Sequence, residues 1–171
     1  MKHLEAFPGV LRNTLALFKG AQIRRRSSTG LFAPVEQAWH LADLEVEGYC
    51  ARIEQLLLID GPHFADFDGG AIAIERSYID LDLETGLRRF ESARATNVAR
   101  LRSASAQQLQ HRATQDGVEG YVTLSRIIEM ITQHDASHAN EIVQLLSEAG
   151  HAISDELLDV TRLDDPLRRT A

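Results

Sequence analysis

The sequence predicts an all-α protein, a four-helix bundle followed by a short C-terminal helix. Apolar residues recur every three or four positions along four long segments, which is the period of helices that bury one face. Strand signals are weak, because the sequence contains neither alternating Val, Ile and Thr runs nor Asn-Gly turns. A length of 171 residues is enough for one domain with a core of ordinary size.

The first two predicted helices are separated by the loop "RRRSSTGLFA", which is rich in turn-forming residues. The first helix is expected from Pro8 to Arg24, with Leu11, Phe18 and either Thr14 or Leu15 facing inward. The second begins at Pro34, because the fixed φ and missing N–H of proline suit the first helical position. Its expected inward positions are Val35, Trp39, Ala42, Val46, Tyr49, Ile53 and Leu56.

The later helices follow the segment "IDGPHFADFDGG", whose Gly, Pro and Asp residues end the second helix. The third is expected from Ala71 to Arg102 and the fourth from Tyr121 to Ala149, with Gly150 as its stop. Ser154 would cap a short amphipathic helix. We therefore divide the chain into a bundle, residues 1–150, and a C-terminal amphipathic tail, residues 151–171.

Composition and charge exclude several classes of protein. Hydrophobic residues make up 44% and charged residues 25%, as in soluble globular proteins, and no apolar run approaches the ~20 residues of a membrane span. A net charge of −7 argues against nucleic-acid binding, which needs a positive surface. The single cysteine, Cys50, cannot form an internal disulfide, and the N-terminus lacks a signal-peptide pattern. We therefore expect a cytoplasmic protein.

The segment "ITQHDASHANEI" places His134 and His138 on the inward face of the fourth helix, between Ile131 and Leu145. Histidines four residues apart lie one turn apart on the same face, so both imidazoles can reach one ion about 2.0–2.1 Å away. Burying two unpartnered imidazoles would cost free energy. The same spacing also occurs on solvent-facing helices. The pair is neither the HExxH of a metalloprotease nor part of a di-iron site.

A metal site would need a third ligand. The candidates are His40, in "QAWHLADLE", and the carboxylates of Asp43, Glu47 and Glu141. Helical periodicity places His40 one residue beyond Trp39, at the flank of the core, so periodicity does not choose among them. The other histidines, which are expected at the surface, are His3, His63, His111 and His151.

These motifs, in this order, resemble the DinB-like (YfiT-like) superfamily. Its members show a histidine early in the second helix, as in "WHLADLE", and an HxxxH pair in the fourth, as in "HDASHANEI". The segments "RI" (Arg52, Ile53), "FADFDG" and "FESARATN" also follow the family order. The likeness covers roughly Leu11 to Leu146.

The resemblance implies a bundle with one long crossover connection and a divalent ion held by His40, His134 and His138. Zn²⁺ or Ni²⁺ is expected, with Fe²⁺ or Mn²⁺ as alternatives. Family members often carry Gln where this chain has Glu141, which could be a fourth ligand. Asp43 and Glu141 are candidates for contacts behind the ligands. On the third helix, Arg94 and Asn97 are candidates for binding substrate.

Characterised relatives include thiol-dependent S-transferases and isomerases that use low-molecular-weight thiols. The resemblance therefore implies a metal-dependent enzyme acting on a small molecule, either such a transferase or a hydrolase, and three protein ligands would leave the metal an open position. No residue is assigned a catalytic role. The alternatives are a non-catalytic metal- or ligand-binding bundle and a helical interaction module.

A homodimer is also expected. Relatives form homodimers, and the segments "LEAFPGVLRNTLALF" and "ELLDVTRL" carry apolar residues beyond the needs of one core.

Overall fold

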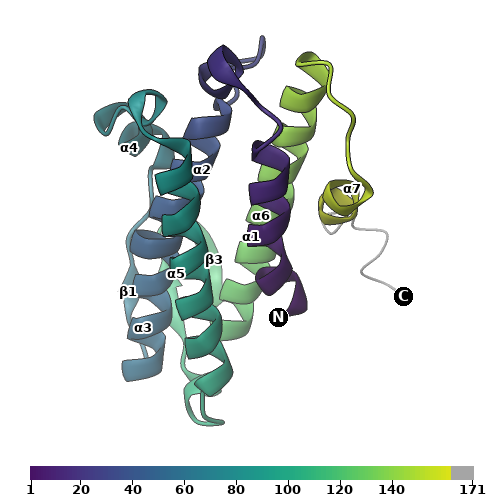
Figure 1. Cartoon of the computed structure of the whole chain (residues 1–171). Helices are drawn as coiled ribbons and strands as arrows, with labels where there is room; N and C mark the ends of the chain where they lie inside the picture. Colours follow the sequence, from purple (N-terminus) through teal and green to yellow (C-terminus); the bar gives the residue numbers. More distant parts are fainter. Residues whose placement is uncertain (163–171) are drawn as a thin grey trace.

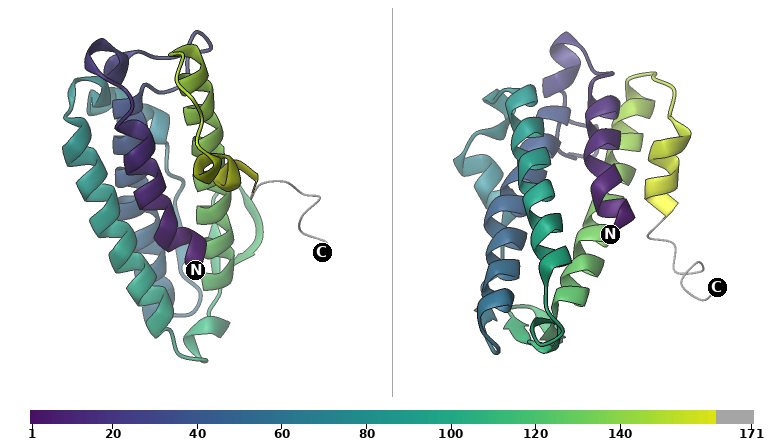
Figure 2. Two further views of the ribbon diagram at one scale, coloured as in Figure 1. Left: turned by 45° about the vertical axis from the view of Figure 1, so that its right-hand side comes forward. Right: turned by 60° about the horizontal axis from the view of Figure 1, so that its bottom comes forward.

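The computed structural model describes residues 1–162 and confirms the helical bundle (Figure 1). Its long elements are α1 (Lys2–Leu15), the run formed by α2 (Pro34–Asp43), η2 (Leu44–Cys50) and α3 (Ala51–Leu58), then α5 (Leu83–Ser103) and α6 (Leu124–Glu148). Helix α1 packs against α5 and α6, and α2 packs against α5. The views in Figure 2 show that α2–α3 and α5 run in the same direction. The chain between them must return along the bundle, which is the expected long crossover connection.

The predicted bounds of the first helix are wrong at both ends. Helix α1 begins at Lys2, and residues Gly20–Arg24 form the separate turn η1. The helix starts early because the apolar stripe extends in front of the proline, with Leu4 and Phe7 as buried as Leu11. Pro8 therefore lies inside the helix, where it cannot donate a backbone hydrogen bond.

The second helix begins at Pro34 as predicted, but η2 is a π-helical turn. Its wider turn shifts the register within one continuous helical run. Before this turn His40 and Leu41 are buried while Trp39 is only half-buried; after it the predicted Tyr49 and Ile53 face the core. The prediction that His40 lies at the flank of the core is wrong, because a constant helical period was assumed.

The third predicted helix, Ala71 to Arg102, is not continuous. It is divided into α4 (Gly69–Glu75), the turn η3 (Tyr78–Asp80) and α5. Ser77 has a left-handed φ of 49°, and the Asp82 side chain accepts a hydrogen bond from the backbone N–H of Thr85 and so caps α5. These two local features interrupt the helix.

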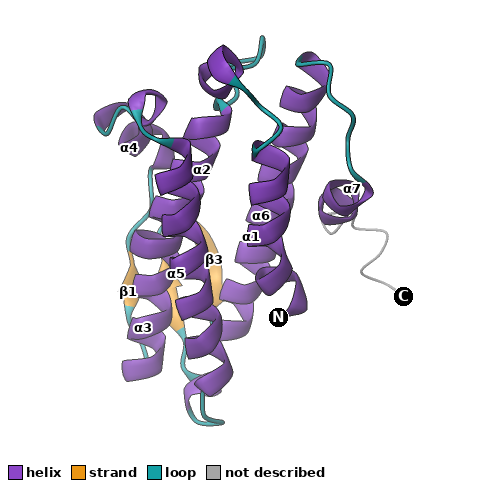
Figure 3. Cartoon of the chain, in the orientation of Figure 1, coloured by secondary structure: helices purple, strands orange, loops and turns teal. Residues whose placement is uncertain are grey.

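The expectation of a chain without strands is also wrong. Strand β1 (His63–Phe64) pairs in parallel with β2 (Ala113–Gln115), which pairs antiparallel with β3 (Val118–Val122). Figure 3 shows this sheet at the end of the bundle where α3 ends. Because β3 takes residues 121 and 122, α6 starts at Leu124, with the Thr123 side chain as its cap.

The end of α6 and the beginning of the tail follow the prediction. Gly150 adopts a left-handed φ of 77°, and the Ser154 side chain caps α7 (Asp155–Thr161). Residues 163–171 of the predicted tail lie outside the described residues. Apolar side chains from both segments that suggested a homodimer pack in a shared core, which includes Phe7, Leu11, Leu157 and Val160. The homodimer stays a prediction without that support.

In the part of the chain that the structure describes, no helix combines the length and the apolar character needed to cross a bilayer.

Candidate metal centre

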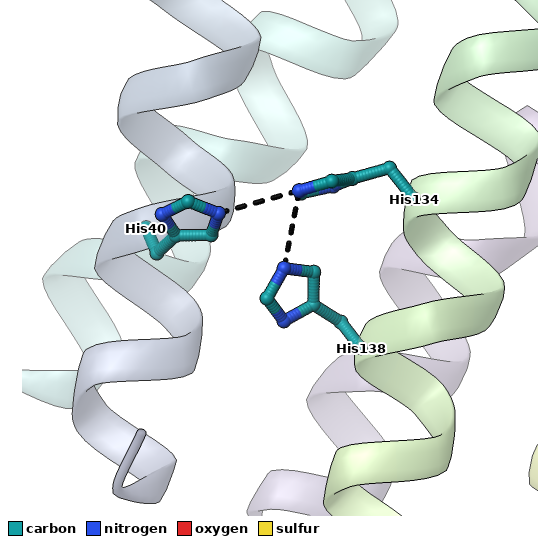
Figure 4. Close-up of side chains that lie close together, drawn as sticks. All are labelled: His40, His134 and His138. Atoms are coloured by element: carbon teal, nitrogen blue, oxygen red, sulfur yellow. Dashed lines mark hydrogen bonds between the residues drawn. The ribbon is translucent and has the colours of Figure 1, made fainter. Parts of the chain in front are cut away.

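Three histidine side chains from two helices point to one place (Figure 4). The Nε2 atom of His134 lies 3.3 Å from Nε2 of His40 and 3.1 Å from Nε2 of His138. One nitrogen of each ring lies within 4.8 Å of the others. The structure therefore brings together the three residues that the sequence motifs singled out.

The spacing of these nitrogens fits a divalent ion. Four ligands placed tetrahedrally at 2.0–2.1 Å from a metal are separated from one another by about 3.3 Å. The proton of His138 sits on Nδ1, because that atom faces the Gln37 carbonyl oxygen, Oε1, at 2.5 Å. Its Nε2 atom therefore presents a lone pair to His134. A cation between the rings would offset the repulsion between such lone pairs.

Burial keeps the imidazoles of His40 and His134 in the neutral form that binds metals. The exposed fraction is 8% for His40 and 6% for His138. Burial, with a further contribution from His138, lowers the pKa of His40 to about 4. Burial likewise lowers the pKa of His134 well below its usual value. Both rings are therefore neutral near pH 7, as metal ligation requires.

Gln37 and Glu141 lie behind His138. Gln37 is fully buried; its Oε1 accepts the bond from His138 Nδ1, and its Nε2 donates to Glu141 Oε2 at 2.6 Å. Burial raises the pKa of Glu141, but hydrogen bonds from His138 and Gln37 more than offset this, so the pKa is lowered. The carboxylate Oε2 is 3.4 Å from Nδ1, on the ring edge opposite Nε2. Glu141 thus lies on the outer side of His138.

The sequence analysis missed Gln37. Its signal was the spacing of three residues to His40, which places both side chains on one face of α2.

The beginning of α4 closes over His40. A Cβ atom on Gly69 would lie 2.3 Å from His40 Cε1 and 2.6 Å from Nδ1, distances that real Cβ atoms do not adopt. Rings of Phe32 and Phe67 also flank His40, with centroids 5.3 and 6.5 Å away. Among the described residues His40 Nδ1 has no hydrogen-bond partner. The close approach of the α4 backbone to the His40 ring therefore favours glycine at position 69.

Asp43 contacts the crossover connection. Its Oδ2 atom accepts hydrogen bonds from Arg76 Nη1 and from the Tyr78 hydroxyl, both at 2.6 Å. Arg89 Nη2 lies 3.1 Å from Oδ1. The carboxylate is thus engaged with three side chains of the segment that follows α4 and of α5.

Arg94 and Asn97 are buried in a second polar cluster. The Arg94 guanidinium donates two hydrogen bonds to Asp135, at 2.8 and 2.9 Å, and its Nε lies 2.9 Å from Glu45 Oε1. Asn97 Nδ2 donates to the same Glu45 oxygen at 3.0 Å. These donors, which the sequence suggested for substrate binding, face carboxylates of the protein itself.

The remaining histidines do not join the three. His63 is exposed and contacts Thr114, while His3, His111 and His151 are half-buried at other places. His3 Nε2 lies 3.3 Å from Asp135 Oδ2, beside the second polar cluster.

Comparisons with known proteins agree with the fold and place the chain in a family. A family model described as the DinB superfamily matches residues 3–142. YfiT from Bacillus subtilis has a similar structure, with a TM-score of 0.80 and 20% sequence identity over 88% of this chain and 86% of that chain. YfiT is described as "a probable metal-dependent hydrolase with an unusual four-helix bundle topology". No curated protein matches the sequence.

Proposed function

Because the chain belongs to the DinB superfamily, we propose that it is a metal-dependent enzyme whose divalent ion is held by His40, His134 and His138. The observation that carries this proposal is the set of three Nε2 atoms directed at one another inside the bundle. Imidazole suits Zn²⁺ and Ni²⁺ best among the expected ions, with Fe²⁺ and Mn²⁺ as alternatives. The Gln37 amide supports the site, because it fixes the tautomer that leaves His138 Nε2 free.

Hydrolysis of a small molecule is the reaction that we favour. A divalent ion on three imidazoles is a Lewis acid that makes a coordinated water or thiol more acidic. Three protein ligands also leave room for a substrate atom. The description of YfiT as a probable hydrolase supports this choice.

The protein's own thiol is a poor candidate nucleophile. Burial raises the pKa of Cys50 and outweighs the opposite effect of Arg100, whose Nη1 lies 2.9 Å from the sulfur. A thiol-dependent S-transfer, which the family resemblance suggests, would therefore need an external low-molecular-weight thiol. Hydrolysis and S-transfer would both use the same three histidines, so only activity assays can distinguish the two reactions.

The test begins with metal analysis of the purified protein by mass spectrometry, compared with His134→Ala. We expect close to one divalent ion per wild-type chain and almost none in the variant. The metal-loaded protein is then assayed for cleavage of nitrophenyl esters, and for coupling of cysteine to chlorodinitrobenzene with release of chloride. Ester cleavage that needs the metal supports the hydrolase. Metal-dependent coupling alone would favour the transferase, and a wild type without metal would contradict both.

A further inference from the structure

Arg52 is a buried cation with little compensation. Its exposed fraction is 7%, yet in the described part of the chain it forms no ion pair. Its one hydrogen bond runs from Nη2 to the backbone oxygen of Ala65, at 3.0 Å, and its Cζ lies 6.0 Å from the centre of the Phe64 ring. Burial lowers the pKa of Arg52. Removing a guanidinium from water without a carboxylate partner costs free energy, and a bound anion would offset part of that cost.

Arg94, by contrast, is a buried arginine whose charge is compensated by carboxylates. Its exposed fraction is 2%, and it meets the carboxylates of Asp135 and Glu45 at 2.8–2.9 Å. Arg52 is buried less deeply than Arg94, at the wall of a groove, and of the two only Arg94 has its charge balanced by ion pairs among the described residues. The donors of Arg52 that remain unused are therefore available to a ligand.

Arg52 lines a groove with a volume of about 300 Å³. Phe64 and Phe67 supply aromatic surface there, and two carboxylates, Glu47 and Asp66, lie in its lining. Glu47 is already paired with Arg76, at 2.7 Å. Apart from His63, the charges left in the groove are those of Arg52 and the exposed Asp66, which sum to zero. A ligand with one negative charge therefore leaves a smaller negative excess than a ligand with two.

We propose that this groove binds the carboxylate of a small organic acid through Arg52, with the ligand's apolar part against Phe64 and Phe67. An arginine fork matches a carboxylate with two parallel hydrogen bonds. The Phe67 ring also contacts the ring of His40, with centroids 6.5 Å apart, so the groove and the metal centre share a wall. This assignment rests on the proposed function: the carboxylate that binds Arg52 belongs to the substrate of the metal centre.

Binding is tested first on the metal-free protein, by following backbone amide signals during NMR titration. The probes are phenylacetate, its neutral analogue phenylacetamide, and inorganic phosphate. We expect phenylacetate to shift the signals of Ala65 and Phe67 and to bind at least tenfold more tightly than either other probe. Arg52→Gln should abolish this preference, and Asp66→Asn should strengthen phenylacetate binding severalfold. Arg126→Gln, which removes an exposed arginine on α6, should change nothing.

Equal binding of phenylacetate to wild type and Arg52→Gln, with circular dichroism showing both folded, would overturn the proposal. Stronger binding of phosphate would overturn the choice of a singly charged carboxylate. The link to the metal centre is tested separately, by loading the protein with Co²⁺ and measuring relaxation of the phenylacetate protons. Enhanced relaxation that His138→Ala removes supports the link. Bound Co²⁺ without that enhancement overturns the link but leaves the groove, and failure to bind Co²⁺ would count against the proposed function alone.

Discussion

Two polar clusters lie inside this bundle, and neighbouring residues of α6 belong to different ones. His134 belongs to the histidine cluster with His40 and His138, whereas Asp135 belongs to the ion-pair cluster with Arg94 and Glu45. In the ion-pair cluster opposite charges meet at hydrogen-bond distance. In the histidine cluster, nitrogen atoms that can all carry lone pairs face one another.

This difference separates a cluster that is complete in itself from one whose geometry fits a metal ion. The ion-pair cluster satisfies its own charges, so its residues hold α5 and α6 together. In the histidine cluster, Gln37 hydrogen-bonds to the outer side of His138, while the three Nε2 atoms face one another at the centre. Buried polar groups that face one another without a complementary partner indicate a ligand. Burial alone does not explain the difference, because His40 and His138 are buried as Asp135 and Arg94 are, while His134 is half-buried.

The largest expected effect follows from breaking the ion-pair cluster. Asp135→Asn leaves Arg94 with much of its buried charge uncompensated, and we expect unfolding to become easier by about 3–5 kcal/mol. Urea denaturation of the metal-free proteins measures this loss. The neighbouring change His134→Asn should cost clearly less, because a neutral imidazole is lost there. Equal losses would remove the distinction between the clusters.

Gly69→Ala strains the histidine cluster from the side of α4. The new methyl group would overlap the His40 ring, so we expect a loss of about 1–3 kcal/mol in stability and weaker binding of Zn²⁺. Gly70→Ala is the matched control, because its Cβ would meet Asp68 at an ordinary 3.5 Å. Thermal unfolding and Zn²⁺ titration of both variants check the expectation. A variant at position 69 that behaves like the control would show that the backbone does not press on His40.

Gln37→Met tests the outer side of the same cluster. Methionine keeps the volume but cannot accept the proton of His138 Nδ1, and such partners typically affect metal affinity 10–100-fold, or about 1.4–2.7 kcal/mol. A competition assay with a chelator measures the affinity, and ¹⁵N NMR of the metal-free protein reports the tautomer of His138. Gln55→Met, an exposed change on α3, is the control. An unchanged tautomer would contradict the role assigned to Gln37.

Acidification should affect the histidine cluster of the metal-free protein. The pKa of His40 falls from its ordinary value of 6.5 to about 4 on folding, so the unfolded chain binds more protons between these values. Stability is therefore highest above pH 6.5 and falls as the pH drops toward 4, by up to about 1.4 kcal/mol per pH unit for each such histidine. Denaturation of wild type and His40→Gln from pH 7 to 4.5 measures the slope. The variant should show a shallower slope, and equal slopes would contradict the assignment.

Much of the fold followed from local signals. Pro34, Gly150 and Ser154 marked helix ends because each has a local backbone or capping role that does not depend on the rest of the chain. Strand β1 could not be predicted, because two residues are too few to show alternation. The β2–β3 hairpin did carry a local signal that was missed, the Asp116-Gly117 pair that forms the whole loop between its strands. The pairing of β1 with β2 joins positions about fifty residues apart.

The candidate site was predicted where the motif was local and missed where it was not. His134 and His138 lie one turn apart on the same helix, so their common face follows from the sequence. The burial of His40 depends on the π-helical turn that follows it, and the spacing of apolar residues did not indicate this turn. The contact between Gly69 and His40 depends on the path of the crossover connection. Tertiary packing therefore decided the geometry of the third histidine.

Calorimetric titration of metal-free protein with Zn²⁺, for wild type and His138→Ala, tests the central claim most directly. If the three histidines form a metal centre, the wild type binds one ion and the variant loses at least 100-fold in affinity, because two imidazoles no longer enclose the cation. The variant should stay folded, since the buried Ile131 and Leu145 remain on the same face of α6. His63→Ala, an exposed histidine elsewhere, should bind like the wild type. Equal affinity in wild type and His138→Ala, or no binding in either, would contradict the account.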